Sequence, residues 1–100
     1  MIDFSKPRFQ FGQIVATPGA LETMEAAKQA PSDFLDRHVR GDWGEVCDED
    51  QEANEQALLD GSRLLSSYKT SLGLKLWVIT DAADDNGQRA VTTILLPDEY

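Results

Sequence analysis

The sequence is poor in the residue types on which disulfides, metal sites and membrane anchors depend. Its 100 residues include one cysteine, Cys47, and one histidine, His38. A single cysteine excludes an intrachain disulfide, and the absence of a Cys/His cluster leaves no ligand set for zinc. No segment approaches the ~20 apolar residues that cross a bilayer, and the N-terminus lacks the apolar run of a signal peptide. We therefore expect a cytoplasmic protein without a metal or other cofactor.

Basic residues are also scarce. The chain has 9 Lys and Arg against 18 Asp and Glu, which gives a formal net charge of -9. This excess repels nucleic acid and anionic membranes, so we expect neither as a direct partner. It favours a protein partner with a basic surface, such as one built to hold nucleic acid; the alternative is that the acidity only keeps the protein soluble. The length allows one domain, and a hydrophobic content of 41% is enough for one small core.

Catalytic motifs are missing as well. No serine lies in the context of a nucleophile elbow. The segment G-D-W-G (Gly41–Gly44) has neither the length nor the lysine of a phosphate-binding loop. Carboxylates around Cys47 disfavour its thiolate, so a pair with His38 is a poor nucleophile, and we interpret His38 as a packed or capping residue. We predict that the protein is not an enzyme; a small hydrolase that depends on His38 is the minor alternative.

Hydrophobic periodicity predicts a single small α+β domain over residues 1–100, in the order β-α-α-α-β-β-β. Residues 1–8 are expected to form a loose N-terminal arm. The expected sheet is antiparallel, has about four strands and carries the helices on one face. The predicted strands span residues 9–16, 63–70, 74–81 and 90–96, and the predicted helices run from 18 to before Pro31, from 32 to 40 and from 48 to 60.

Helix ends have their own signals. Thr17 followed by Pro18 predicts the start of the first helix, because the hydroxyl accepts a free N–H and proline fits the first helical position. Ser32 is the expected cap of the second helix. Asp48 is expected to cap the third, with Gln51 at the capping-box position. Gly61 is a typical residue for its C-terminal end.

Glycines mark three further features. Gly12 inside the first strand indicates a bulge or a close backbone approach. Two glycines flank Trp43 in the segment Gly41–Gly44, which predicts a turn that places the indole in the core. Asn86-Gly87 predicts a two-residue hairpin loop. With that loop, Val78 would face Leu95, Ile79 would face Ile94, and Thr80 would face Thr93.

The most unusual stretch is Asp42–Asp60, which contains no Lys or Arg. Asp48, Glu52 and Glu55 lie at i, i+4 and i+7, so a helix places them along one side at steps of roughly 4.5–6 Å, close to the spacing of phosphates on a nucleic-acid strand. Nothing basic within the stretch neutralises them, which predicts a partner-binding surface; the alternative is a solvated polar face. The eight carboxylates of this predicted surface are Asp42, Glu45, Asp48, Glu49, Asp50, Glu52, Glu55 and Asp60.

Metal binding by the acidic residues is the weaker interpretation. The segment that begins at Asp48 is similar to a calcium loop, but Ala53 replaces the required glycine and Leu59 stands where the bidentate glutamate belongs. Asp81, Asp84 and Asp85 at the expected hairpin tip would bind a divalent ion only weakly. A solvated turn explains these three residues better.

Four segments carry a further signal: Phe34–Gly44, Asn54–Tyr68, Leu76–Asp84 and Thr92–Tyr100. Together they resemble a family of small bacterial proteins carried largely by plasmids, phages and other mobile elements. Members are often labelled plasmid-related or type I restriction subunit M-like. The resemblance runs from about Gln13 to the C-terminus. Its most specific part is G-D-W-G (Gly41–Gly44), within the block H-V-R-G-D-W-G (His38–Gly44). The segment Ala82–Ala90 is longer than is usual in the family.

The resemblance implies a mobile-element origin but no catalytic residues. Small acidic proteins of such elements often inhibit host defence by imitating DNA. We therefore expect an anti-CRISPR or anti-restriction protein in the bacterial cytoplasm, a monomer or small homo-oligomer whose acidic stretch occupies the basic DNA-binding surface of a defence complex. The alternative is a plasmid-maintenance or antitoxin-like interaction module that does not imitate DNA.

Overall fold

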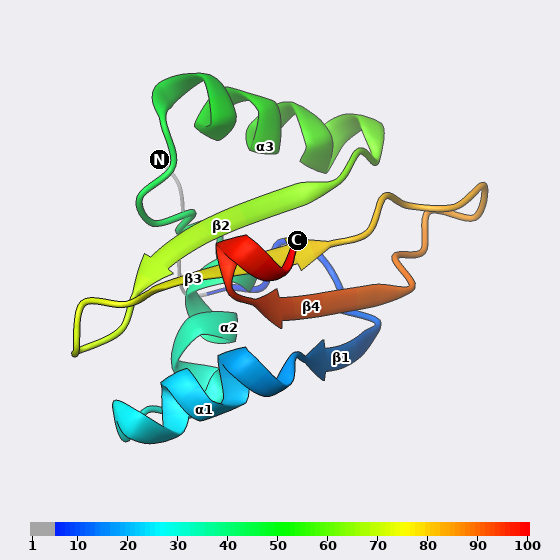
Figure 1. Cartoon of the computed structure of the whole chain (residues 1–100). Helices are drawn as coiled ribbons and strands as arrows, with labels where there is room; N and C mark the ends of the chain where they lie inside the picture. The colour runs from blue at the N-terminus through cyan, green and yellow to red at the C-terminus, as the bar shows by residue number, and fades with distance from the viewer. Residues whose placement is uncertain (1–5) are drawn as a thin grey trace.

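The computed structural model describes residues 6–100, so residues 1–5 of the expected arm lie outside the described part (Figure 1). The predicted order of elements is confirmed, and the domain is a small α+β fold. No helix within residues 6–100 has the length and apolarity to span a membrane. The elements are β1 (Gln13–Ala16), α1 (Pro18–Ala26), α2 (Pro31–Val39), α3 (Asp48–Asp60), β2 (Leu64–Lys69), β3 (Lys75–Thr80), β4 (Val91–Leu95) and the 3-10 helix η1 (Pro97–Glu99).

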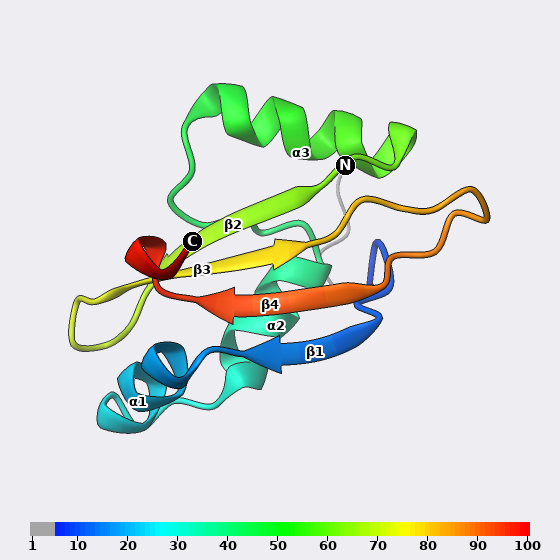
Figure 2. The same ribbon diagram turned by 45° about the vertical axis from the view of Figure 1, so that its right-hand side comes forward.

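The four strands form one sheet in the order β1-β4-β3-β2 (Figure 2). Strands β2, β3 and β4 make an antiparallel meander, whereas β1 joins β4 in parallel. The sheet is therefore mixed, and the expectation of a wholly antiparallel sheet is wrong for β1. Periodicity shows which residues of a strand face the core but not the direction of the strand. Three helices separate β1 from β2, so no tight turn fixes that direction.

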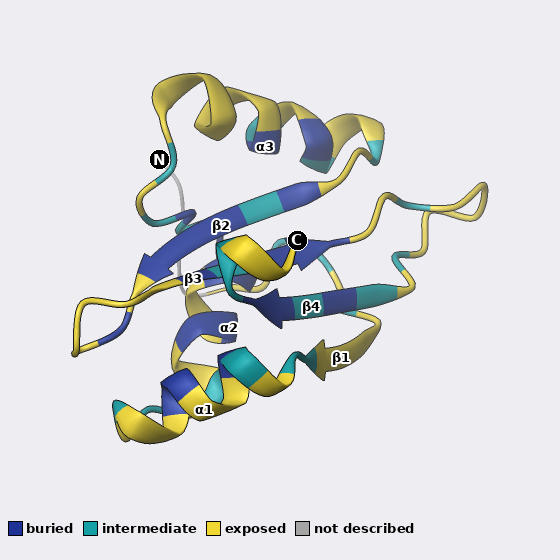
Figure 3. Ribbon diagram, viewed as in Figure 1, coloured by how far each residue is buried: buried dark blue, intermediate teal, exposed yellow. Residues whose placement is uncertain are grey.

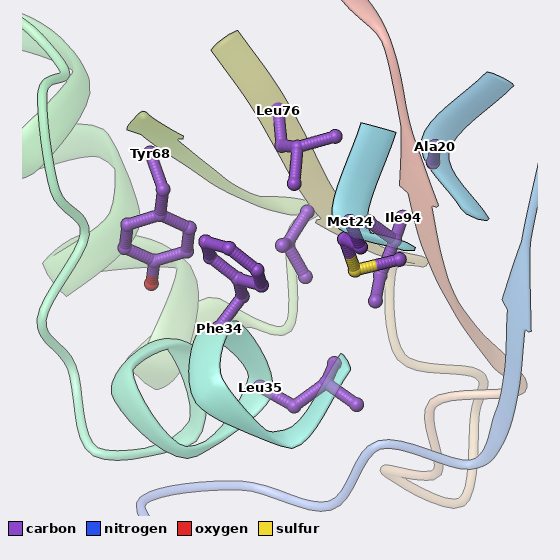
Figure 4. Close-up of a cluster of buried hydrophobic side chains, with 8 residues drawn as sticks. Ala20, Met24, Phe34, Leu35, Tyr68, Leu76 and Ile94 are labelled. Carbon is purple, nitrogen blue, oxygen red and sulfur yellow. The ribbon is translucent and has the colours of Figure 1, made fainter. Parts of the chain in front are cut away.

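The helices cover one face of the sheet, as predicted. Tyr68, Leu76 and Ile94 from three neighbouring strands meet Met24 of α1 and Phe34 of α2 in the main core (Figure 4). A second cluster joins Leu64 of β2 to α3. Leu64 and Tyr68 are four residues apart on β2, so both clusters lie on the same face. The second cluster consists of Trp43, Ala57 and Leu64 with Phe9, Val46 and Leu58 packed against it.

The first strand is shorter than predicted. Only Gln13–Ala16 pairs with β4, whereas 9–16 was expected. The backbone leaves the extended conformation at Gly12, which has a φ of 67°, and a Cβ there would lie 2.3 Å from the carbonyl oxygen of Arg89. The close approach predicted for Gly12 is thus confirmed. Phe9 packs instead against the rings of His38 and Trp43.

Two of the three predicted helix caps are wrong. Thr17 caps α1 as expected, since its hydroxyl accepts the N–H of Ala20 at 3.2 Å. Helix α2 begins at Pro31, before the predicted cap Ser32, and the Asp33 carboxylate accepts the N–H of Ala30 at 2.9 Å in place of a Ser32 cap. Cys47, not Asp48, precedes α3 and makes no side-chain cap bond. The predicted end of α3 at Gly61 is confirmed by its left-handed φ of 82°.

The predicted register of the β3–β4 hairpin is wrong by one residue. Val78 pairs with Ile94 and Thr80 pairs with Thr92. The reason is the length of the loop. The N–H of Asp84 donates to the Gln88 carbonyl, and the N–H of Gly87 donates to the Asp84 carbonyl. The loop between residues 84 and 88 therefore contains three residues, whereas the prediction assumed two. Gly87 has a φ of 77°, as the left-handed position of a three-residue hairpin requires.

The outer edge of β2 is closed by side-chain and backbone groups. The amide of Asn54, a buried residue of α3, donates to the Leu65 carbonyl at 2.7 Å and accepts the Leu65 N–H at 3.0 Å. Two residues further on, the N–H of Ser67 donates to the Trp43 carbonyl, and the Ser67 carbonyl accepts the N–H of Glu45. The Asn54 amide thus occupies the outward N–H and C=O of Leu65, which a neighbouring strand would otherwise bind. At the opposite edge, no segment of residues 6–100 runs along the outer side of β1 in Figures 1 and 2.

Candidate interaction surface

The acidic stretch forms a turn and a helix that lie beside β2. Helix α3 has the predicted bounds, and its outward side is exposed over most of its length (Figure 3). The preceding turn is anchored by Trp43, whose side chain is buried as predicted. The eight carboxylates divide into two groups: three have basic partners in the chain and five do not within residues 6–100.

Glu55 is the most strongly held member of the first group. Both of its oxygens accept from the guanidinium of Arg8, at 2.9 and 3.0 Å, and one also accepts the indole N–H of Trp43 at 2.9 Å. Arg8, assisted by Trp43, holds the pKa of Glu55 below its ordinary value against the opposing effect of burial. Glu55 therefore links Arg8, which precedes β1, to the indole of Trp43 in the turn.

Asp42 and Glu45 also have partners. Asp42 accepts two bonds from Arg37, at 2.8 and 3.3 Å, and its carboxylate accepts the N–H of Gly44 at 3.2 Å. The guanidinium of Arg37 lies 4.5 Å from the centre of the Tyr68 ring, and the Tyr68 hydroxyl donates to the Asp42 carbonyl at 2.5 Å. Glu45 approaches Lys69 at 3.8 Å. Asp42 thus stabilises the turn that holds Trp43.

These ion pairs correct the expectation that all eight carboxylates of the stretch are free to bind a partner. The stretch itself has no basic residue, but cations from outside it neutralise three of its eight carboxylates. Arg8 belongs to the arm predicted to be loose, yet its N–H donates to the Val39 carbonyl at 2.7 Å and its side chain binds Glu55. A contact between residues 47 positions apart leaves no local signal in the sequence.

The remaining five carboxylates lie at the surface. Three of them occupy the first turn of α3, where the positive end of the helix dipole stabilises negative charge. Asp60 at the other end accepts the N–H of Ser62 at 2.9 Å. The exposed carboxylates without an ion pair within residues 6–100 are Asp48, Glu49, Asp50, Glu52 and Asp60.

We predict that replacement of Arg8 by glutamine lowers the free energy of unfolding by about 1 kcal/mol, because a partly buried carboxylate loses a two-bond partner. The pKa of Glu55 should rise towards its ordinary value. Urea denaturation and an NMR titration of the Glu55 carboxyl carbon measure the two effects. Lys75→Gln is the matched control, since Lys75 is an exposed cation without an ion pair among the described residues. Equal stability of the two variants would contradict a structural role for Arg8.

A chain of buried hydrogen bonds crosses the core beneath this surface. His38 is fully buried; its Nδ1 lies 2.5 Å from Ser66 Oγ and its Nε2 lies 2.9 Å from Thr80 Oγ1. Thr80 Oγ1 is 2.8 Å from Thr92 Oγ1, and the Thr92 hydroxyl donates to the Phe11 carbonyl at 2.8 Å. Each hydroxyl carries one proton. Because the Thr92 hydroxyl donates its proton to the Phe11 carbonyl, the Thr80 hydroxyl must be the donor in its bond with Thr92.

This order fixes the tautomer of the histidine. Since the Thr80 proton points to Thr92, Nε2–H of His38 donates to Thr80, and Ser66 donates to the unprotonated Nδ1. Burial, with a smaller contribution from the charge of Arg89, lowers the pKa of His38 to about 3. His38 is therefore neutral, and both of its nitrogens have partners.

The hydrogen bonds of His38 also concern the two pairs in which it could act as a catalytic base, with Ser66 or with Cys47. Ser66 and His38 are within hydrogen-bond distance, as a nucleophile and its base are, but neither has any exposed surface through which a substrate would reach it. Cys47 is exposed at the start of α3, and His38 directs both ring nitrogens to other residues.

Within residues 6–100, no group of three or more His, Cys, Asp or Glu side chains is placed to hold a metal ion. At the hairpin tip, the carboxylate of Asp84 accepts the N–H groups of Asn86 and Gln88, both at 2.9 Å. Asp84 therefore shapes the loop. Comparison with protein-family models, with curated proteins and with solved structures finds no match.

Proposed function

We propose that the protein is a non-enzymatic inhibitor of a bacterial defence complex and that it imitates DNA. The target would be the basic DNA-binding surface of a CRISPR–Cas effector or a restriction enzyme, where the inhibitor blocks recognition of the target DNA or of its adjacent motif. The supporting observation is the solvent side of α3, where Asp48, Glu49, Asp50 and Glu52 are exposed without ion-pair partners among residues 6–100.

The proposed surface is narrower than the whole acidic stretch. Glu55 and Asp42 already bind Arg8 and Arg37, so they hold the turn and the helix in place. The free carboxylates concentrate in the first half of α3. Asp48 and Glu52 lie one helical turn apart, at a rise of about 6 Å, which is the separation of successive phosphates on an extended strand.

Physical chemistry favours a basic partner for such a helix. Like charges within one turn repel each other, and a Lys/Arg surface relieves that repulsion on contact. Long-range attraction between the two surfaces raises the association rate and makes it sensitive to salt. The ion pairs of Glu55 and Asp42 fix the helix before binding, so little conformational entropy is lost when the partner binds.

Charge reversal at the first half of α3 tests the proposal. We expect Asp48→Lys combined with Glu52→Lys to weaken binding to a Cas effector or type I restriction complex by about 30-fold at ~0.15 M salt, equivalent to about 2 kcal/mol. Surface plasmon resonance at several salt concentrations measures the affinity and its salt dependence. The DNA-binding activity of the complex should recover in parallel.

The matched control is Glu22→Lys with Glu25→Lys. It makes the same change in net charge on exposed residues of α1. If the control weakens binding as much as the α3 variant, net charge rather than the α3 surface is responsible. If the α3 variant binds like the unmodified protein, imitation of DNA by this helix is excluded. Loss of plasmid stability on gene deletion, with host immunity unaffected, would instead favour a plasmid-maintenance role.

A further inference from the structure

The outer edge of β1 has free backbone hydrogen-bonding groups. The N–H groups of Gln13 and Thr17 donate to carbonyl oxygens of the segment 90–94, which contains most of β4, at 2.8 and 3.0 Å. Because the backbone groups of a strand point alternately to its two sides, those of Ile14 and Ala16 point away from β4. No segment of residues 6–100 runs along that side in Figures 1 and 2. These N–H and C=O groups can therefore bind a further strand.

The segment around β1 carries no charge. Phe9–Leu21 contains no Lys, Arg, Asp or Glu and is the longest such run in the sequence. Ile14 and Val15 on β1 expose 47% and 38% of their surfaces. Edge strands are commonly protected from further pairing by a charged residue or a proline, and β1 contains neither. The edge therefore suits an uncharged, apolar strand.

The charged groups near the two ends of β1 already have partners in the chain. At the C-terminal end, the Glu99 carboxylate accepts the Thr17 hydroxyl at 2.5 Å and the Leu96 N–H at 2.8 Å. It lies at the first turn of α1, where the helix dipole stabilises negative charge. At the other end, the guanidinium of Arg89 binds three carbonyl oxygens around the end of α3. Glu22, the first charged residue after β1, lies in the second turn of α1. The edge itself is neutral.

A second copy of β1 fits this edge in one register. If two β1 strands run antiparallel with Val15 opposite Val15 of the other copy, Ile14 of each copy exchanges two hydrogen bonds with Ala16 of the other. Every outward group of both strands is then paired. A shifted register would pair an outward residue with Gly12, whose φ of 67° leaves the extended conformation, or with Pro18, which has no N–H. The edge is therefore complementary to itself.

The distribution of charge permits this pairing, although each chain has a formal net charge of -9. Helix α3 lies beside β2, the strand furthest from β1 in the sheet. In a sheet joined through β1, seven strand spacings of about 4.8 Å, or roughly 34 Å, separate the two β2 strands. Charges that far apart are screened, since the Debye length is about 8 Å at physiological ionic strength. Two copies can meet at β1 with their acidic stretches at opposite ends.

We propose that the protein forms a homodimer in which the β1 strands of two copies pair antiparallel and join the two sheets. The strand that fills the edge is β1 itself, because β2, the other outer strand, has outward groups of Leu65 and Ser67 bound within its own chain. Strands of four residues bury less than the ~1,200–2,000 Å² of a standard interface, so we expect a dissociation constant of roughly 0.1 mM. The dimer does not depend on the proposed function.

Sedimentation equilibrium of the full chain in reducing buffer tests the dimer, at concentrations of ~0.01 to 1 mM that span the expected dissociation constant. We expect the average mass to rise from that of one chain towards that of two. Val15→Lys places two like charges opposite each other at the centre of the pair and should weaken association at least ~10-fold. Leu72→Lys is the matched control, since Leu72 is 61% exposed in the turn between β2 and β3. It should associate like the unmodified chain.

Cysteine cross-linking tests the register. In a Cys47→Ser background, Val15→Cys places the two new thiols opposite each other, with Cα atoms about 4.5 Å apart, which is within the range of a disulfide. Gln13→Cys is the control on the same face of β1, because the two positions would lie about 14 Å apart. Oxidised glutathione should link Val15→Cys and leave Gln13→Cys unlinked. A mass that stays that of one chain up to ~1 mM, equal association of Val15→Lys and Leu72→Lys, or equal linking of the two cysteine variants would overturn the proposal.

Discussion

Acidification from pH 6.5 to pH 4 is expected to lower the free energy of unfolding by about 3 kcal/mol through His38 alone. Its pKa in the folded protein is about 3, because burial disfavours the charged ring. In the unfolded chain His38 takes up a proton below its ordinary pKa of 6.5. Between these two values the unfolded state binds more protons than the folded state, so stability falls as the pH falls.

The hydrogen-bond chain explains why the folded state resists that proton. Nδ1 accepts from Ser66, so protonation there would turn an acceptor into a donor and leave the Ser66 proton without its present partner. Nε2–H already donates to Thr80. An additional proton therefore breaks a bond inside the core as well as adding a buried charge, and both effects oppose it.

Urea denaturation at pH 7, 6, 5 and 4 measures the effect, with His38→Gln for comparison. A glutamine amide can accept from Ser66 and donate to Thr80 but does not titrate. The carboxylates of Glu55, Asp60 and Glu99 also have pKa values below their ordinary ones, and their stabilising effect is lost only as the pH falls through and below those ordinary values. The range from pH 6.5 to 5 therefore isolates the histidine. Parallel profiles of the two proteins in that range would show that His38 is not the responsible group.

Replacement of Asn54 by alanine is expected to cost about 2–4 kcal/mol of folding free energy. The Asn54 amide makes two bonds to one residue of β2, accepting the Leu65 N–H and donating to the Leu65 carbonyl. Alanine would leave both backbone groups without partners at a partly buried position, and each such group costs about 1–3 kcal/mol. Faster hydrogen exchange of the Leu65 amide should accompany the loss of stability.

Two further variants define the role of Asn54. Gln56→Ala changes an exposed amide two residues away on the same helix and should alter stability by less than about 0.5 kcal/mol. Asn54→Asp keeps an oxygen for the Leu65 N–H but loses the donor to the Leu65 carbonyl and buries a charge. It should therefore be at least as unstable as Asn54→Ala. If Asn54→Asp were as stable as the unmodified protein, the amide donor would be unnecessary for closing the edge.

The features of the fold that could be predicted from the sequence are those set by residues close together in the chain. The helix that begins after Thr17 and the one that ends at Gly61 were found because a capping hydroxyl and a left-handed glycine act within a few residues. The hairpin register failed because Asn86-Gly87 permits more than one loop. Here the Asp84 carboxylate binds two N–H groups and stabilises the three-residue form.

The candidate surface also has one part that follows from residues close in sequence and one part that depends on the tertiary fold. Its exposed half, from Asp48 to Glu52, follows from helical spacing and charge alone. The pairing of Glu55 with Arg8 depends on the tertiary fold, which brings the two residues together across 47 positions. Likewise, the hydrogen bonds of His38 to Ser66 and Thr80 require the packing of α2 on the sheet, which periodicity does not specify.

The unequal edges of the sheet limit how these molecules can assemble. Strand β1 carries no charged residue, and Ile14 and Val15 are exposed on it, so it can accept one further strand. The other edge cannot, because the Asn54 amide and the turn at Trp43–Glu45 already bind its outward groups. Two molecules joined through β1 would present only closed edges. Growth by strand addition would therefore stop at a pair, because the Asn54 amide occupies the Leu65 groups at the other edge.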